Sequence, residues 1–106
     1  MDSPRKVAIQ TVYGCLKDAK TLSENWSDIS DGQFYFSQIS ERASYIKWSS
    51  NELIKYLAEH QDTPPLIVIE QFRDKMYDYS HLNPKGSFIF SVAYEVALYV
   101  ITKLVD

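Results

Sequence analysis

The densest run of side chains that could do chemistry in this 106-residue sequence lies between residues 70 and 81. It contains carboxylates, a tyrosine and an imidazole: Glu70, Asp74, Tyr77, Asp78 and His81. On a helix, the spacings of four, four and three would place the three acids and the histidine along one flank. Such oxygens suit a hard cation, but di-metal helical proteins use a Glu-x-x-His motif on paired helices, and the sequence contains none. A solvated acidic face is the simpler interpretation, and a metal-dependent enzyme that uses this flank is an alternative hypothesis.

No other group of residues matches a known catalytic pattern. Cys15 falls on an apolar seam, and no local signature pairs it with His60 or His81 as nucleophile and base. Three glycines are too few for a phosphate-binding loop, and Walker, hydrolase-elbow and zinc-ligand spacings do not occur. We therefore expect no catalytic residues, no metal and no cofactor, and a protein that is not an enzyme.

Tyr77 with its acidic neighbours predicts a surface that binds another protein. Tyrosine is a rigid anchor that loses little entropy on binding, and carboxylates around it attract a basic partner. Trp48 falls two positions past Ile46 and partly outside the apolar seam, so it is either a rim covered by the last helix or a further contact point. The predicted partner-binding residues are Glu70, Asp74, Tyr77, Asp78, His81 and Trp48.

The composition supports a binding role in a reducing compartment. Eleven basic and fourteen acidic residues give a net charge of −3, which does not favour nucleic-acid backbones. A single cysteine cannot form an internal disulfide, and the first ten residues lack the apolar core of a signal peptide, so we expect a cytoplasmic protein. Glu95 and Lys103 would be costly in lipid, so we expect no membrane span.

These observations lead to one functional hypothesis and two alternatives. We expect a small, non-catalytic protein-binding module, for example an immunity protein or antitoxin that neutralises a basic toxin such as a nuclease. A structural or regulatory homodimer, whose apolar seams continue across a two-fold axis, is the second hypothesis. The metal-dependent enzyme described above is the third.

Two long helices are predicted in the first sixty residues. Ser3 followed by Pro4 is a helix start, and the first helix is expected to run to about Asp28, with a break near Ser23 to Asn25 as the alternative. Its apolar seam is Ala8, Val12, Cys15, Ala19, Leu22, Trp26 and Ile29. The second helix is predicted from about Gln33 to His60 with the seam Phe36, Ile39, Ala43, Ile46, Ser50, Leu53 and Leu57. The capping-box form of Ser49 to Glu52 allows a new start there, but the unbroken seam favours one continuous helix.

Two shorter helices complete the prediction. Thr63-Pro64-Pro65 starts a helix that runs to about Tyr79, with threonine as cap and an inner face of Leu66, Ile69, Phe72, Met76 and Tyr79. Residues 83–86 match a type I turn, after which Ser87 caps the last helix. In that helix the polar residues Ser91, Glu95, Tyr99 and Thr102 form one stripe, so we expect all the remaining side chains of the helix to face inward.

The resulting fold class is all-α. We predict a single domain over residues 1–106: an antiparallel four-helix bundle with a long helical hairpin, two shorter helices and the C-terminal helix at the centre. The rival is that the β-branched and aromatic residues after Ser87 form strands, but no second run of that kind exists to pair with them.

Overall fold

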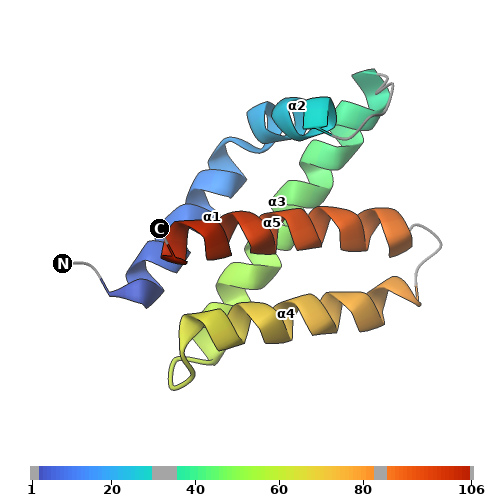
Figure 1. Cartoon of the computed structure of the whole chain (residues 1–106). Helices are drawn as coiled ribbons and strands as arrows, with labels where there is room; N and C mark the ends of the chain where they lie inside the picture. Colours follow the sequence, from blue (N-terminus) through green and yellow to red (C-terminus); the bar gives the residue numbers. More distant parts are fainter. Residues whose placement is uncertain (1–2, 30–35, 83–85, 106) are drawn as a thin grey trace.

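Helices make up nearly all of residues 3–29, 36–82 and 86–105, which are the residues that the computed structural model describes. The helices are α1 (Pro4–Lys17), α2 (Ala19–Ile29), α3 (Phe36–Glu59), α4 (Pro65–Ser80) and α5 (Gly86–Val105), as Figure 1 shows. No strand occurs within these ranges, so the all-α prediction is confirmed. The Cα radius of gyration is 13.5 Å, close to the ~13 Å expected of a compact chain of this length.

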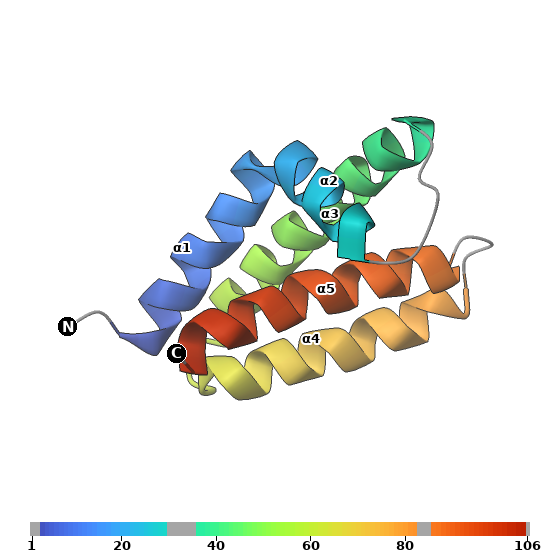
Figure 2. The same ribbon diagram turned by 45° about the horizontal axis from the view of Figure 1, so that its top comes forward.

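The first predicted helix is in fact two helices that meet at Asp18. Asp18 leaves the helical region with φ −102° and ψ 23°, and α2 continues at an angle to α1 (Figures 1 and 2). Its amide still donates to the Gly14 carbonyl, and its carbonyl accepts from the Leu22 amide, both at 2.9 Å. Because the hydrogen bonds continue, the apolar seam keeps its phase across the bend and Cys15 and Ala19 are both buried. The prediction of one helix to about Asp28 is therefore wrong, and so is its alternative, a break near Ser23 to Asn25, since α2 runs through those residues.

The second predicted helix is confirmed as one continuous element over its described part. α3 passes through residues 49–52 without interruption. Its seam positions Ala43, Ile46, Ser50, Leu53 and Leu57 are buried. The side chains of Phe36 and Ile39, and residues 33–35, lie outside what the structure describes.

The starts of α1 and α4 differ in how well the sequence predicted them. The Ser3 hydroxyl accepts from the Lys6 amide at 3.2 Å, so this cap is confirmed. The predicted Thr63 cap is wrong, because the N-cap of α4 is Pro64, which makes no side-chain hydrogen bond. α5 begins at Gly86, one residue before the predicted cap, while the predicted turn falls on residues 83–85, outside the described part.

The inner face of α4 is displaced from the predicted one. Ile69, Phe72 and Met76 are buried as expected, and Val68 is buried with them. Leu66 and Tyr79 were also predicted to face inward, but they are 40% and 37% exposed. α4 therefore presents apolar side chains to solvent at its first turn.

α5 packs against α1, α3 and α4 and buries one side of its surface. The buried positions are Ile89, Val92, Ala93, Val96, Ala97 and Val100. Ser91 and Thr102 are exposed, as the polar stripe predicted. However, Tyr94, Leu98 and Val105 are also exposed. The prediction that all side chains outside the polar stripe face inward is therefore wrong. Three neighbouring helices do not cover a helix that is apolar around most of its circumference.

Arg5 joins α1 to the end of α3 and the loop after it, which lie far from α1 in sequence. Its guanidinium donates to the carbonyl oxygens of Leu57 at 2.7 Å, His60 at 2.8 Å, Gln61 at 3.0 Å and Thr63 at 2.5 Å. These carbonyls belong to the last turn of α3 and the loop that follows. A helix C-terminus carries unsatisfied carbonyls and partial negative charge, so a cation there is favourable. The contact fixes α1 against the α3–α4 connection.

Candidate interaction surface

Five of the six predicted partner-binding residues lie on α4 or immediately after it. Glu70, Asp74, Tyr77, Asp78 and His81 are all exposed, and helical spacing places them on one side of α4. We call these five residues the acidic face. Within the part of the chain that the structure describes, no salt bridge engages Glu70, Asp74 or Asp78.

Tyr77 is half exposed, at 51%, yet its ring is held on two sides. It meets the His81 ring edge-on at 4.7 Å between centroids and the Phe90 ring of α5 at 5.4 Å. Edge-to-face pairs at these separations are favourable, and they restrict the rotamers that the tyrosine adopts. Tyr77 is thus presented in one orientation, which lowers the entropy lost when it contacts a partner.

The basic side chains of α4 and α5 lie over aromatic rings. Arg73 is 5.7 Å from the Tyr94 centroid, Lys75 is 5.1 Å from that of Tyr56, and Lys103 is 5.5 Å from that of Tyr99. Cation–π contacts of this length are attractive and require no carboxylate. This arrangement explains how an α4 sequence with interspersed charges still presents its carboxylates to solvent.

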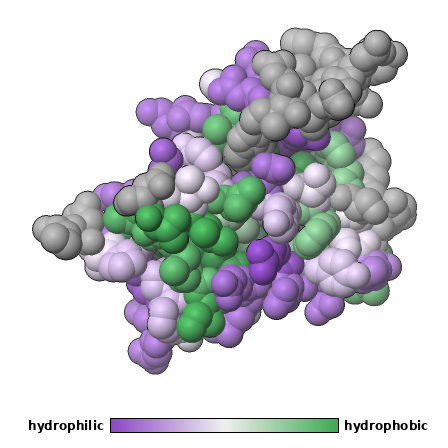
Figure 3. Space-filling view, in the orientation of Figure 1, coloured by the Kyte–Doolittle hydropathy of each residue, from purple (hydrophilic) through white to green (hydrophobic). Residues whose placement is uncertain are grey.

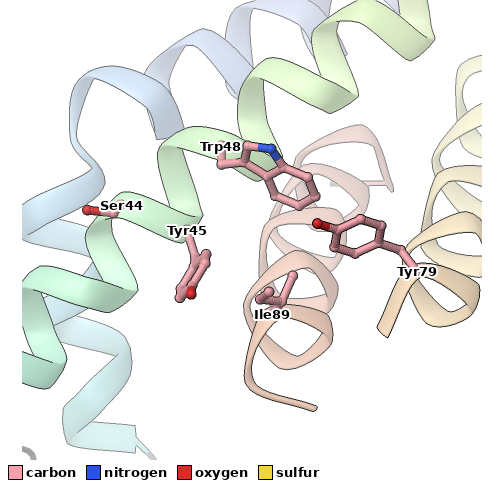
Figure 4. A pocket seen from close by; sticks show the side chains of 5 residues that line it. All are labelled: Ser44, Tyr45, Trp48, Tyr79 and Ile89. Atoms are coloured by element: carbon pink, nitrogen blue, oxygen red, sulfur yellow. The ribbon is translucent and has the colours of Figure 1, made fainter. Parts of the chain in front are cut away.

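Trp48 lies apart from the acidic face. It is partly buried on α3, and its ring packs against Tyr79 of α4 at 5.4 Å between centroids. Together with Ser44, Tyr45 and Ile89 these two rings line a pocket of about 320 Å³ where α3, α4 and α5 meet (Figure 4). Tyr79 occupies a different side of α4 from the acids, so the structure does not bring Trp48 to the surface that holds the other five predicted residues.

Sequence reasoning missed a second surface feature, a row of exposed apolar side chains. We call it the apolar stripe; it consists of the exposed Tyr94, Leu98 and Val105 and the half-buried Ile101 on α5, with the exposed Leu66 and Ile67 on α4. Figure 3 shows apolar surface gathered over the C-terminal half of α5 and the adjacent start of α4. The spacing of four, three and four along α5 is a helical repeat visible in the sequence, but it was assigned to the core.

The Cys15 thiol is buried, and the acidic residues of α4 are not grouped as metal ligands. Burial, together with the negative charge of Asp18, raises the pKa of the Cys15 thiol to about 12. A thiol in this state is a poor nucleophile at neutral pH. Among the described residues, no three His, Cys, Asp or Glu side chains are grouped so as to hold a metal ion, and this includes the flank from Glu70 to His81.

By length and composition the segment Phe88–Val105 is apolar enough to cross a membrane, although the core helix of a soluble protein passes the same test; 33% of that window is buried. Comparisons of the chain with protein-family models, with curated proteins and with solved structures give no significant match.

Proposed function

We propose that this chain is a non-catalytic protein-binding module that holds a basic partner protein on the acidic face of α4. The observation that carries the proposal is Tyr77, which is half exposed, braced by His81 and Phe90, and flanked by Asp74 and Asp78. Tyrosine anchors at the centre of an interface with charged groups around them are typical of protein–protein recognition.

The scaffold in this proposal is the antiparallel helical bundle, with the bent pair α1 and α2 in place of one long helix and α5 at the centre. Contacts of α5 with α1, α3 and α4 support that arrangement. The acidic face is built on a helix rather than a loop, and α4 buries Ile69, Phe72 and Met76 beneath it. A rigid base of this kind reduces the ordering cost of binding.

A basic partner fits the charge of the surface and of the whole chain. The carboxylates of α4 are not paired with bases among the described residues, and the net charge of −3 adds a field that attracts a cationic protein. Charge complementarity of this kind raises association rates and selects partners. A protein that occludes a basic toxin, such as an immunity protein or antitoxin for a nuclease, is one concrete form of this function.

The proposal is tested by reversing two charges on the acidic face. The Asp74→Lys/Asp78→Lys variant and the native chain would be used to capture partners from a cell extract, and the affinity for each captured protein would then be measured at low and high salt. Both positions are exposed, so the free energy of unfolding should change by less than about 0.5 kcal/mol. We expect the affinity of the variant to fall and to lose its salt dependence.

A matched control makes the same change in net charge elsewhere. Asp18 and Glu24 are exposed near the α1–α2 bend, and α2 makes no contact with α4 among the described residues. The Asp18→Lys/Glu24→Lys variant should therefore bind the partner more tightly than the α4 variant does. Equal affinity of the two variants would show that overall charge, and not the acidic face, attracts the partner.

A further inference from the structure

The apolar stripe is exposed surface that the packing of the five helices does not explain. Leu98 is 46% exposed, Val105 65% and Ile67 46%, although each belongs to a helix whose opposite side is buried. Single exposed apolar residues are ordinary, but a contiguous set on two adjacent helices is typical of a binding surface.

The register of α4 and α5 makes the stripe continuous. The two helices lie side by side in both ribbon views, and the pairs Arg73–Tyr94 and Tyr77–Phe90 fix them antiparallel. This register places Leu66 level with Ile101. The first turn of α4 therefore widens the stripe at the end where Leu98 and Val105 lie.

The spacing along α5 suits a helix as occupant. Steps of four, three and four residues keep Tyr94, Leu98, Ile101 and Val105 in one narrow row, which is the repeat that a second helix packs against at a small crossing angle. An extended strand docks by hydrogen bonds to unpaired backbone groups, and the surface of a helix offers no such groups.

Charge along the borders indicates the chemistry of that helix. Glu70 borders the stripe from α4, with Asp74 beyond it. Ser91 and Thr102 follow the opposite border with Glu95, whose charge acts on Arg42 of α3, and on the α4 side the Arg73 guanidinium lies over the Tyr94 ring. Basic side chains on an incoming helix would therefore meet carboxylates at the edge of the apolar contact.

We infer that the apolar stripe binds an amphipathic helix with basic flanks, supplied by the partner protein. This inference rests on the proposed function and names the part of the partner that docks. A second copy of the chain would bring the carboxylates bordering one stripe against those bordering the other, and an anionic membrane surface would repel them, so both fit the stripe less well.

The probe is a synthetic labelled peptide with leucine at helical a and d positions and lysine elsewhere. Its binding to the full chain is followed by fluorescence anisotropy, alongside a peptide of the same residues in scrambled order. We expect the amphipathic peptide to bind more tightly, and the Ile67→Gln/Leu98→Gln variant to weaken it by about tenfold. The control variant Tyr13→Gln/Leu82→Gln, which changes exposed apolar residues outside the stripe, should bind like the native chain at an unchanged melting temperature.

Equal binding of the scrambled peptide, or equal binding by the Ile67→Gln/Leu98→Gln variant, would overturn the inference. So would a dimer in sedimentation that this variant dissociates, or binding to vesicles of anionic phospholipid that this variant abolishes. The Asp74→Lys/Asp78→Lys variant separates the two proposals. If it alone loses the peptide, the stripe is refuted while the acidic-face proposal stands. If the stripe variant alone loses the peptide, the stripe is supported, and the acidic-face proposal is decided by the affinity of the Asp74→Lys/Asp78→Lys variant for the captured partner protein.

Discussion

Replacing Arg5 with methionine should destabilise the fold, although the side chain is partly exposed. The guanidinium donates to four carbonyls of the α3 C-terminus and the α3–α4 loop, and so joins α1 to that loop. Methionine keeps the length and most of the apolar contact of the side chain but removes every donor.

The expected loss follows from the number and the setting of these hydrogen bonds. A hydrogen bond to a charged group contributes about 1.5–3 kcal/mol, but the bonds to Leu57, His60 and Thr63 are only partly buried and the bond to Gln61 is exposed. Water therefore replaces some of the lost donors. The four contributions therefore do not add, and we expect the free energy of unfolding to fall by about 2–3 kcal/mol in total. For a domain of this size that is a decrease of about 10–15 °C in melting temperature.

Urea denaturation followed by circular dichroism measures this change, with an unchanged dependence on urea concentration as evidence that the unfolded state is not altered. Arg5→Lys should lose about half as much, because an ammonium keeps the charge but cannot reach carbonyls in a planar fork. Arg73→Met is the control: its guanidinium lies over the Tyr94 ring, and losing one cation–π contact should lower the free energy of unfolding by less than about 1 kcal/mol. An Arg5→Met variant as stable as the Arg73→Met variant would refute the role assigned to the four carbonyls.

Three further changes test the packing. Burial raises the pKa of Cys15 from 9.0 to about 12, so the thiol of the unfolded chain ionises before that of the folded chain as the pH rises. The free energy of unfolding, measured by urea denaturation, should therefore fall by about 1.4 kcal/mol between about pH 8 and pH 10. The Cys15→Ala variant should show no such fall. The Ser50 hydroxyl is buried without a hydrogen-bond partner, so Ser50→Ala should raise the unfolding free energy by about 0.5–1 kcal/mol, and a loss of stability would show that the hydroxyl is bonded. A Cβ at Gly86 would overlap the Ser80 carbonyl, whereas one at Gly14 meets nothing, so thermal melts should show Gly86→Ala destabilised by about 1–3 kcal/mol and Gly14→Ala stabilised by up to about 1 kcal/mol.

Helical periodicity predicted the elements well because burial in this fold follows it closely. The seam positions from Ala8 to Ala19 are buried, and α3 is continuous where its seam is unbroken. The same periodicity could not find the bend at Asp18, since the hydrogen bonds on both sides of it keep the seam in phase. A one-residue departure from helical geometry leaves no mark on the spacing of apolar residues, and Ser23, which does favour caps and turns, is buried within α2.

The candidate site was only partly predictable for a different reason. Phe72 and Met76 mark the buried side of α4, and helical spacing places Glu70, Asp74 and Tyr77 away from it. Their exposure could therefore be predicted. The position of Trp48 depends on where α4 lies against α3, which is a tertiary contact with no local signal. The contacts of Arg5 are likewise invisible in sequence, because they join residues more than fifty positions apart.

Burial within the fold explains why Val96 of α5 is apolar, but it does not fully explain why Leu98 is. They are close in hydrophobicity and two positions apart, yet Val96 is fully buried and Leu98 is 46% exposed. Burial of Val96 against neighbouring helices accounts for its apolar character by stability alone, at about 25 cal/mol for each Å² removed from water. That account extends only in part to Leu98 and Val105, which the described residues leave 46% and 65% exposed. A contiguous set of apolar side chains that gains little from folding needs a second reason to be apolar, and removal from water by a bound helix supplies one, because the same free energy per unit area is then gained on association.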